Sequence, residues 1–383
     1  MSGSEPSEPV VALASELIAA ASVSRDSNAE ASAICRRELL AAGFEIETVP
    51  LAGAVPKESI VAFRAGTGFG GVGGGFAYFG HTDVVPADNW TGPGGPFEPT
   101  FADGRLYGRG ACDMKGSVAA MLVAARQSTD GPVWIVLTAD EEVGFGGARS
   151  VVAESKGYRD LVARQPVCLI GEPTQRRVLH GHKGGVVWTL QADGEQGHSS
   201  FGTEQSASRR LLRTLGTLSE IVESLATDPQ YRDERFEPPG PTPNVQFSDA
   251  SPAVNITSSR ATARVFVRVT PVMDLRPIAE RLEQACRDAG VSLRQTPVWP
   301  ALYRDPSSET IRALCEVTGG PSRTAAYGTD GCVFSEPERI AVCGPGSIDQ
   351  AHTTDEFITL DELRGGVDLY GRMLERFAGD SSV

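Results

Sequence analysis

The stretch Val133-Trp134-Ile135-Val136-Leu137-Thr138-Ala139-Asp140-Glu141-Glu142-Val143-Gly144 joins a short apolar run to an acidic triplet. A short, continuous apolar run is typical of a buried strand. Neighbouring carboxylates repel each other, so an acidic triplet at a strand end needs solvent or cations nearby. Either the triplet forms a solvated turn, or one carboxylate binds a metal ion while its neighbour transfers protons.

Two further apolar runs also end in polar residues. Residues 76–79 lead into Gly80-His81-Thr82-Asp83, and residues 167–170 lead into Gly171-Glu172-Pro173-Thr174. Such runs alternate with helical segments such as 116–127, which predicts an α/β fold with a mixed, largely parallel sheet and helices on both faces. Because ligands bind such sheets beyond the carboxyl ends of the strands, we expect three strands to deliver polar groups to one edge.

The pattern changes after about residue 184. Strand-like runs at 186–190, 244–247, 261–269 and 291–293 alternate with helical spacing at 211–225 and 274–289. The resulting order, βαββαβ, is typical of a small α+β domain inserted into a larger one. We predict a catalytic domain in two parts, 1–181 and 296–383, around an inserted domain at 182–295.

Composition narrows the functional classes. The chain has 383 residues and a formal net charge of −14, which argues against nonspecific binding to nucleic acid or anionic membranes. Seven cysteines without C-x-x-C spacing indicate reduced thiols in a cytoplasmic protein. Segment 1–9 resembles a disordered tail more than a signal peptide, and no apolar run is long enough to span a membrane. The glycine-rich segment 66–75 precedes a strand, so we favour a flexible turn over a nucleotide-binding loop.

Several isolated residues could carry metal chemistry. His81 and Asp83 share one side of a strand end, where the Asp83 carboxylate could accept the imidazole N–H and orient the ring. Asp113 precedes the helical run 116–127, so it is either a helix cap or a bridging ligand. Taken alone, Glu172 and His352 could be ordinary turn residues.

Together these residues form a more specific set. His81, Asp113, Glu142, Glu172 and His352 supply two imidazoles and three carboxylates. Mixed shells of this kind suit zinc, cobalt or manganese. A bridging carboxylate would let two ions, about 3.5–4 Å apart, share a water molecule.

Four motifs occur in an order that resembles one family. They are GHTDVVP at 80–86, GRGACDMKG at 108–116, TADEEVG at 138–144 and GEPT at 171–174. The chain is similar to the dinuclear-metal amidohydrolases that include acetylornithine deacetylase, succinyl-diaminopimelate desuccinylase, aminoacylases and glutamate carboxypeptidases. The resemblance implies a phosphorylase/hydrolase-like catalytic domain interrupted by a ferredoxin-like lid domain that forms a homodimer.

The resemblance also assigns roles. It implies two divalent metal ions, zinc first and cobalt second, on His81, Asp113 (bridging), Glu142, Glu172 and His352. It implies Glu141 as general base, Asp83 as histidine orienter and His198 as a lid residue that stabilises the oxyanion. It places substrate contacts at Asn255, Arg268 and Thr329. His180 and His182 could bind metal as an H-x-H pair, but the matching family segment favours hinge packing.

The expected reaction is amide hydrolysis of an N-acyl amino acid, with N-acetylornithine as the leading substrate. GPGSIDQAH at 344–352 and His182-Lys183-Gly184 resemble the acetylornithine deacetylase branch, whereas segment 327–331 is closer to the desuccinylases. Desuccinylation, another aminoacylase activity and a carboxypeptidase activity therefore stay open. A non-catalytic metal-binding homologue and a nucleotide-binding protein are the alternatives from other classes.

Overall fold

The computed structural model describes residues 8–66 and 74–379. The chain forms two compact units, and each is described by itself. The first contains the chain up to Gly181 together with Arg304–Arg323 and Thr329–Val383. The second contains His182–Tyr303 and Thr324–Gly328. The predicted tail, 1–9, lies outside the described residues except for its last two residues, and a helix starts at Pro9. The glycine-rich segment, 66–75, lies outside them except at its two ends.

A mixed sheet forms the centre of the first unit. Seven of its nine strands are, in spatial order, β1 (Glu45–Leu51), β2 (Lys57–Arg64), β6 (Val133–Thr138), β3 (Phe76–His81), β7 (Val167–Ile170), β15 (Ile340–Val342) and β8 (Leu179–His182). Strands β6, β3, β7 and β15 are parallel to their neighbours in this group. Strand β2 runs antiparallel to both β1 and β6, which makes the sheet mixed. Strand β8 runs antiparallel to β15. The predicted α/β fold with a mixed sheet is confirmed, and the parallel pairs join its four central strands.

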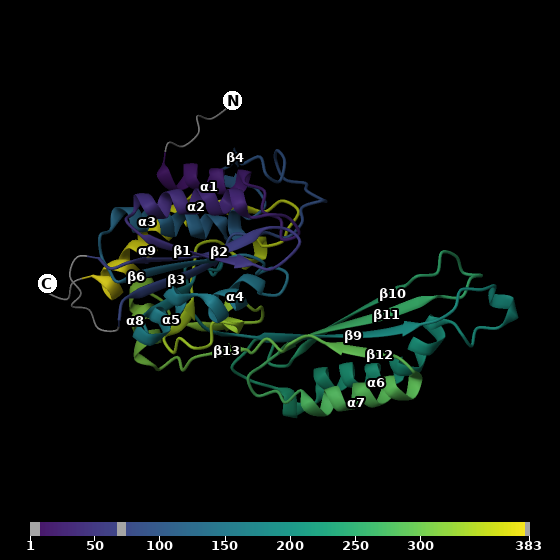
Figure 1. Cartoon of the computed structure of the whole chain (residues 1–383). Coiled ribbons are helices and arrows are strands. Elements are labelled where there is room, and N and C mark those ends of the chain that lie inside the picture. The colour runs from purple at the N-terminus through teal and green to yellow at the C-terminus, as the bar shows by residue number, and fades with distance from the viewer. Residues whose placement is uncertain (1–7, 67–73, 380–383) are drawn as a thin grey trace. The chain divides into compact units, whose positions relative to one another are not determined.

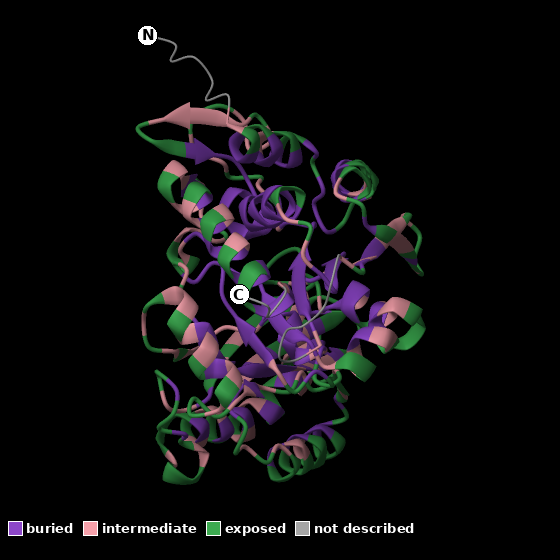
Figure 2. Cartoon of the chain, turned by 90° about the vertical axis from the view of Figure 1, so that its left-hand side faces the viewer, coloured by how far each residue is buried: buried purple, intermediate pink, exposed green. Residues whose placement is uncertain are grey.

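Helices cover both faces of this sheet (Figure 1). One face carries α1 (Pro9–Ala19), α2 (Ala29–Ala41), α3 (Gly116–Gln127) and α9 (Leu360–Ala378), with α8 (Glu309–Thr318) packed against α9. The other carries α4 (Gly146–Glu154) and α5 (Lys156–Arg164). Figure 2 shows the central strands buried along their length, whereas the surface helices have one buried and one exposed side. A small sheet, β16 (Phe357–Thr359), β5 (Arg105–Tyr107) and β4 (Thr100–Ala102), lies in the same unit.

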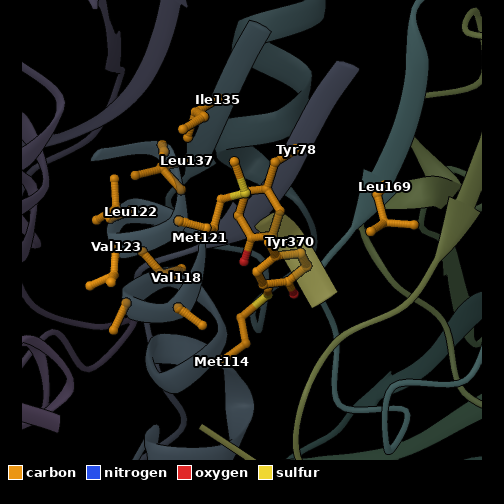
Figure 3. Packing of buried hydrophobic residues seen from close by; sticks show 14 of the residues in the cluster. Tyr78, Met114, Val118, Met121, Leu122, Val123, Ile135, Leu137, Leu169 and Tyr370 are labelled. Carbon is orange, nitrogen blue, oxygen red and sulfur yellow. The ribbon is translucent and has the colours of Figure 1, made fainter. Parts of the chain in front are cut away.

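The core beneath the strand ends is held by aromatic rings and hydroxyl groups. Tyr78 of β3 and Tyr370 of α9 pack edge to face with ring centroids 5.3 Å apart (Figure 3). Ser117 Oγ links the two hydroxyl groups, at 2.9 Å from Tyr78 Oη and 2.7 Å from Tyr370 Oη. A Cβ atom on Gly171 would lie 2.4 Å from Tyr78 Oη, so glycine is required where β7 ends. This packing fixes the strand ends that carry the polar residues.

The second unit has the predicted βαββαβ order. It comprises β9 (Gly184–Asp193), α6 (Ala207–Thr227), β10 (Thr242–Asp249), β11 (Arg260–Val269), α7 (Arg276–Ala289) and β12 (Ser292–Gln295). The antiparallel sheet has the spatial order β10-β11-β9-β12, and α6 and α7 pack side by side on it (Figure 1). The burial pattern of β11 alternates because its buried side chains face these helices.

The second unit extends beyond the predicted end at 295. Gly185 and Trp299 exchange backbone hydrogen bonds of 2.9 and 2.8 Å, which joins the segment after β12 to β9. Thr324 Oγ1, in β14 (Arg323–Ala325), donates to the Arg235 carbonyl at 2.6 Å. Among the described helices, none has the length and apolar character needed to cross a membrane.

Candidate active site

Three parallel strands bring the predicted residues to one edge of the main sheet. In the strand registers His81 pairs with Thr138, and Phe79 pairs with Ile170. His81 therefore ends β3 beside the acidic turn that follows β6, and Glu172 follows β7 on the other side. This convergence is the edge that the sequence pattern predicted.

Two segments from outside the central strands complete the cluster. Asp113 comes from the turn η1 (Ala111–Lys115), directly before α3. His352 comes from the loop after the turn η5 (Ile348–Gln350), with a left-handed φ of 63°. The structure thus brings together all five residues that the sequence nominated as metal ligands.

The distances make Asp113 the centre of this cluster. Its Oδ1 lies 2.9 Å from His81 Nε2, and its Oδ2 lies 3.3 Å from His352 Nε2. Glu142 Oε1 is 3.1 Å from His352 Nε2, and Glu172 Oε1 is 3.8 Å from His81 Nε2. Asp113 therefore faces one histidine with each oxygen, and each histidine also faces one glutamate.

The electrostatics of the cluster favour cations. Burial raises the pKa of Glu172, Glu142 and Glu141, and neighbouring carboxylates raise them further. Burial would also raise the pKa of Asp113, but hydrogen bonds with His352 and His81 hold it well below its ordinary value. Hydrogen bonds to Asp113 and Glu142 raise the pKa of His352 to about 10. Concentrated negative charge with imidazole nitrogens is the donor set that zinc-like ions bind.

The donor atoms are close enough for one ion to bind several of them. Ligand atoms of His81, Asp113 and Glu142 all lie within 4.8 Å of one another. With Glu172 and His352 adjoining, the residues fit two cations that share Asp113.

Hydrogen bonds to both its amide and its carbonyl fix the backbone of Glu141. Its N–H donates to Asp83 Oδ1 at 3.1 Å, and its carbonyl accepts from Gly144 at 3.1 Å and Phe145 at 3.3 Å. Within residues 8–66 and 74–379, no hydrogen bond or ion pair engages the Glu141 carboxylate, which is nearly buried. A fixed backbone with an uncommitted carboxylate suits proton transfer.

Asp83 makes contacts that differ from the expected one. His81 Nδ1 hydrogen-bonds to the backbone oxygen of Asp83 at 2.9 Å, while Asp83 Oδ1 is 3.7 Å from that nitrogen. The carboxylate instead accepts from the Glu141 N–H, from the Glu142 N–H at 3.4 Å and from Ser24 Oγ at 2.7 Å. Because the backbone oxygen of Asp83 orients the His81 ring, the Asp83 carboxylate can accept the backbone amides of Glu141 and Glu142.

Asp140 has a structural contact of its own. Its Oδ1 lies 2.6 Å from Lys57 Nζ, which also donates to the Ser24 carbonyl. Asp140 adopts a left-handed φ of 56°, so this ion pair stabilises a tight turn immediately before Glu141. Nothing in the sequence pattern indicated Lys57 or Ser24, because both are distant along the chain.

The remaining predicted residues divide between the units. His198 is exposed in the second unit, where its Nδ1 accepts from Ser200 N at 3.2 Å. Asn255 is also exposed, and its carbonyl accepts from Ser199 N at 2.9 Å. Arg268 lies on β11, with its guanidinium 4.7 Å from the centre of the Phe266 ring.

Two further expectations concern buried residues. Thr329, in the first unit, is fully buried, and its Oγ1 accepts from Gly331 N at 3.0 Å. That hydroxyl caps a local turn, so a substrate contact would require the segment to open. His182 is also fully buried, with Nδ1 3.0 Å from the Lys183 carbonyl, and His180 Nδ1 lies 3.0 Å from Ser322 Oγ.

Comparisons with known proteins identify the family of the chain. The model of Peptidase family M20/M25/M40 matches residues 77–376. The chain is 31% identical to acetylornithine deacetylase of Myxococcus xanthus over 381 residues, covering 95% of this chain and 96% of that protein.

Solved structures show the same fold. An M20 family metallo-carboxypeptidase of Sulfolobus solfataricus superposes with a TM-score of 0.74 at 17% identity, covering 96% of this chain and 99% of that one. A dinuclear metal-binding M20 peptidase of Bacillus subtilis superposes with a TM-score of 0.60 at 15% identity, covering 95% and 96%. A family match that spans all five clustered residues, with a relative aligned along almost the whole chain, places the protein in Peptidase family M20/M25/M40.

Proposed function

We propose that the protein hydrolyses the amide bond of an N-acyl amino acid with two divalent metal ions. The observation that carries this proposal is the placement of Asp113, whose two oxygens face His81 and His352 separately. Glu172 adjoins the first histidine and Glu142 the second, so each ion would have one imidazole, one terminal carboxylate and a share of Asp113. Zinc is the first metal to test and cobalt the second.

The residues of this chain divide the chemistry between them. When bound, the ions would polarise the amide carbonyl and lower the pKa of the attacking water. Glu141 takes the proton from that water and delivers it to the leaving nitrogen. The Asp83 carboxylate accepts a hydrogen bond from the backbone amide of Glu141 and so holds that backbone in place. We assign oxyanion stabilisation to His198, because an imidazole N–H can donate to developing negative charge.

For the substrate we propose N-acetylornithine. The Myxococcus xanthus relative is an acetylornithine deacetylase, and it aligns along almost the entire chain. Arg268 would bind the substrate carboxylate, since a guanidinium can form two parallel hydrogen bonds with it, and Asn255 would assist. We propose Thr329 as a further substrate-binding residue; because it is buried and its hydroxyl already accepts from Gly331 N, its segment would have to open for this contact.

We also propose that the protein forms a homodimer through the second unit. Strand β10 is an edge strand, and edge strands offer unpaired backbone groups to a second chain. Phe247 on β10 is 61% exposed and Leu212 on α6 is 63% exposed. These two side chains line a mainly apolar surface cavity of about 310 Å³ between the two elements, which a second copy could cover. Sedimentation velocity on the full chain would test this association.

A substrate panel tests the proposed function directly. The zinc-loaded protein is assayed for amine release from N-acetylornithine, N-succinyl-diaminopimelate and N-acetylmethionine. We expect the highest kcat/KM with N-acetylornithine. Preference for the succinyl substrate would move the assignment to a desuccinylase, and preference for N-acetylmethionine to another aminoacylase. No turnover, together with well under two metal ions per chain after loading, would favour a non-catalytic homologue.

A further inference from the structure

Glu356 is a buried carboxylate that the proposed reaction does not use. It is fully buried and lies four residues after His352, immediately before β16. Burying a carboxylate is costly unless hydrogen bonds and an opposite charge compensate it. Glu356 has both, and within residues 8–66 and 74–379 the hydrogen-bond partners of its carboxylate lie in the segment 109–113, which ends at Asp113.

The two carboxylate oxygens divide these partners. Oε1 accepts from Cys112 N at 2.9 Å and from Asp113 N at 3.0 Å. Oε2 accepts from Arg109 Nη1 at 2.7 Å and from Gly110 N at 3.1 Å. Hydrogen bonds to an ionised acceptor are about twice as strong as neutral ones. One side chain therefore holds most of the turn that presents the central aspartate.

The backbone joins the same two segments. Gly108 N donates to the Glu356 carbonyl at 3.1 Å, and Phe357 pairs with Tyr107 in the β16–β5 ladder. The segment bearing His352 and the segment bearing Asp113 are thus connected at consecutive positions. Because Asp113 Oδ2 and His352 Nε2 are only 3.3 Å apart, a shift of either segment would change the spacing of the metal donors.

We propose that Glu356 is a positioning residue that sets the place of Asp113 relative to His352 and thereby the affinity for the metal ions. This inference rests on the proposed function, because it assumes that Asp113 and His352 bind metal. Among the described residues, the carboxylate of Glu356 makes no hydrogen bond or ion pair with the side chain of a proposed metal ligand. Its effect passes through the backbone amides of Cys112 and Asp113.

The test measures zinc binding to the metal-stripped full-length protein. Zinc is titrated calorimetrically into the wild type, Glu356→Gln and Glu356→Asp, with circular dichroism to show that each variant is folded. Glu356→Gln keeps the size but loses the charge, and Glu356→Asp keeps the charge but withdraws the oxygens by about one bond, ~1.5 Å. We expect zinc affinity to fall about 10- to 100-fold in both, as is typical when a residue supporting a metal ligand is lost.

Glu38→Gln is the matched control. Glu38 is a nearly buried carboxylate of α2 that accepts from Arg37 Nε at 2.9 Å and Arg126 Nη1 at 2.7 Å. Like Glu356 it is a buried carboxylate that pairs with arginine, but both of these arginines lie outside the segment 109–113. We expect its loss to lower the melting temperature of the metal-stripped protein while zinc affinity stays at the wild-type value.

The outcomes separate this inference from the proposed function. Wild-type zinc affinity in either folded Glu356 variant, with two ions bound to the wild type, would overturn the positioning role alone. If Glu356→Gln does not fold, Glu356→Asp decides. A wild type that binds no zinc would overturn the proposed function and this inference with it.

Discussion

Replacement of Asp83 by asparagine separates two roles of one carboxylate. Asp83 Oδ1 accepts from the Glu141 amide at 3.1 Å, and Oδ2 accepts from Ser24 Oγ at 2.7 Å and the Glu142 amide at 3.4 Å. Asparagine has one acceptor oxygen, so it can keep the bond to Glu141 or the bond to Ser24 in its present form, but not both. The backbone oxygen of Asp83, which orients His81, is unchanged by the substitution.

The expected losses follow from these contacts. A hydrogen bond to a charged acceptor contributes about 1.5–3 kcal/mol, so losing one should lower the free energy of unfolding by about 2 kcal/mol. If the turn at Glu141 moves by about 1 Å, kcat should fall up to ~10²-fold. KM and metal content should change little, because His81 keeps its bond to the Asp83 backbone oxygen and the amide of Glu142 makes the longest of the three bonds to the carboxylate, at 3.4 Å.

The assay combines metal analysis, urea unfolding and steady-state hydrolysis of N-acetylornithine. Ser24→Ala is the control, because it removes one partner of the same carboxylate without touching the glutamate amides. We expect it to lower the free energy of unfolding by about 2 kcal/mol, as Asp83→Asn does, and to leave kcat near the wild-type value. A metal-replete Asp83→Asn variant with wild-type kcat would refute the positioning of Glu141. Loss of metal with normal kcat per bound ion would instead restore the role of histidine orienter.

Two further predictions concern stability near the site. Burial raises the pKa of the Asp330 carboxyl from 3.8 to about 6 in the folded protein. The folded state therefore binds this proton more tightly than the unfolded state does. The resulting stabilisation of the folded state is complete below about pH 4 and is lost as the pH rises through 6. Asparagine carries no charge at any pH, so Asp330→Asn should stabilise the metal-stripped protein by up to about 3 kcal/mol above pH 7 and should not stabilise it below pH 4. If urea unfolding gives the same stability difference between variant and wild type at both pH values, this prediction is wrong. Lys57 and Asp140 form an ion pair with side chains 11% and 17% exposed. A double-mutant cycle with Lys57→Met and Asp140→Asn should give a coupling free energy of about 1–2 kcal/mol, and a value near zero would remove this pair from the support of the turn.

Much of the fold was predictable because hydrophobic periodicity reports local structure. Helix α3 occupies the predicted residues, and β11 starts within one residue of the predicted run. The strand β2 was omitted from the sequence analysis, although Ile60-Val61-Ala62-Phe63 is a short apolar run. Its direction could not be predicted, because pairing with both β1 and β6 depends on residues far apart in the chain.

In the candidate site, too, the positions of residues along the chain were predictable, whereas their long-range contacts were not. Four of the five clustered residues follow strand ends or precede a helix, so topology alone could bring them to one edge. His352 lies in a loop after η5, and its place beside Asp113 could not be read from the strand order. The contacts of Asp83 could not be inferred, because an i, i+2 spacing indicates a shared side but not which atom bonds. Glu356 was visible within Thr353-Thr354-Asp355-Glu356-Phe357, yet its partners lie more than 240 positions earlier. Only the folded chain shows what that carboxylate holds.

The division of labour between Glu141 and Glu142 is tested most directly by one pair of variants. Glu141→Gln and Glu142→Gln are loaded with zinc, and bound metal and kcat for N-acetylornithine are measured on the same samples. We expect Glu141→Gln to retain both ions and lose at least ~10²-fold in kcat, and Glu142→Gln to lose metal. Near-normal turnover by metal-replete Glu141→Gln would contradict the assignment of Glu141 as the residue that transfers the proton.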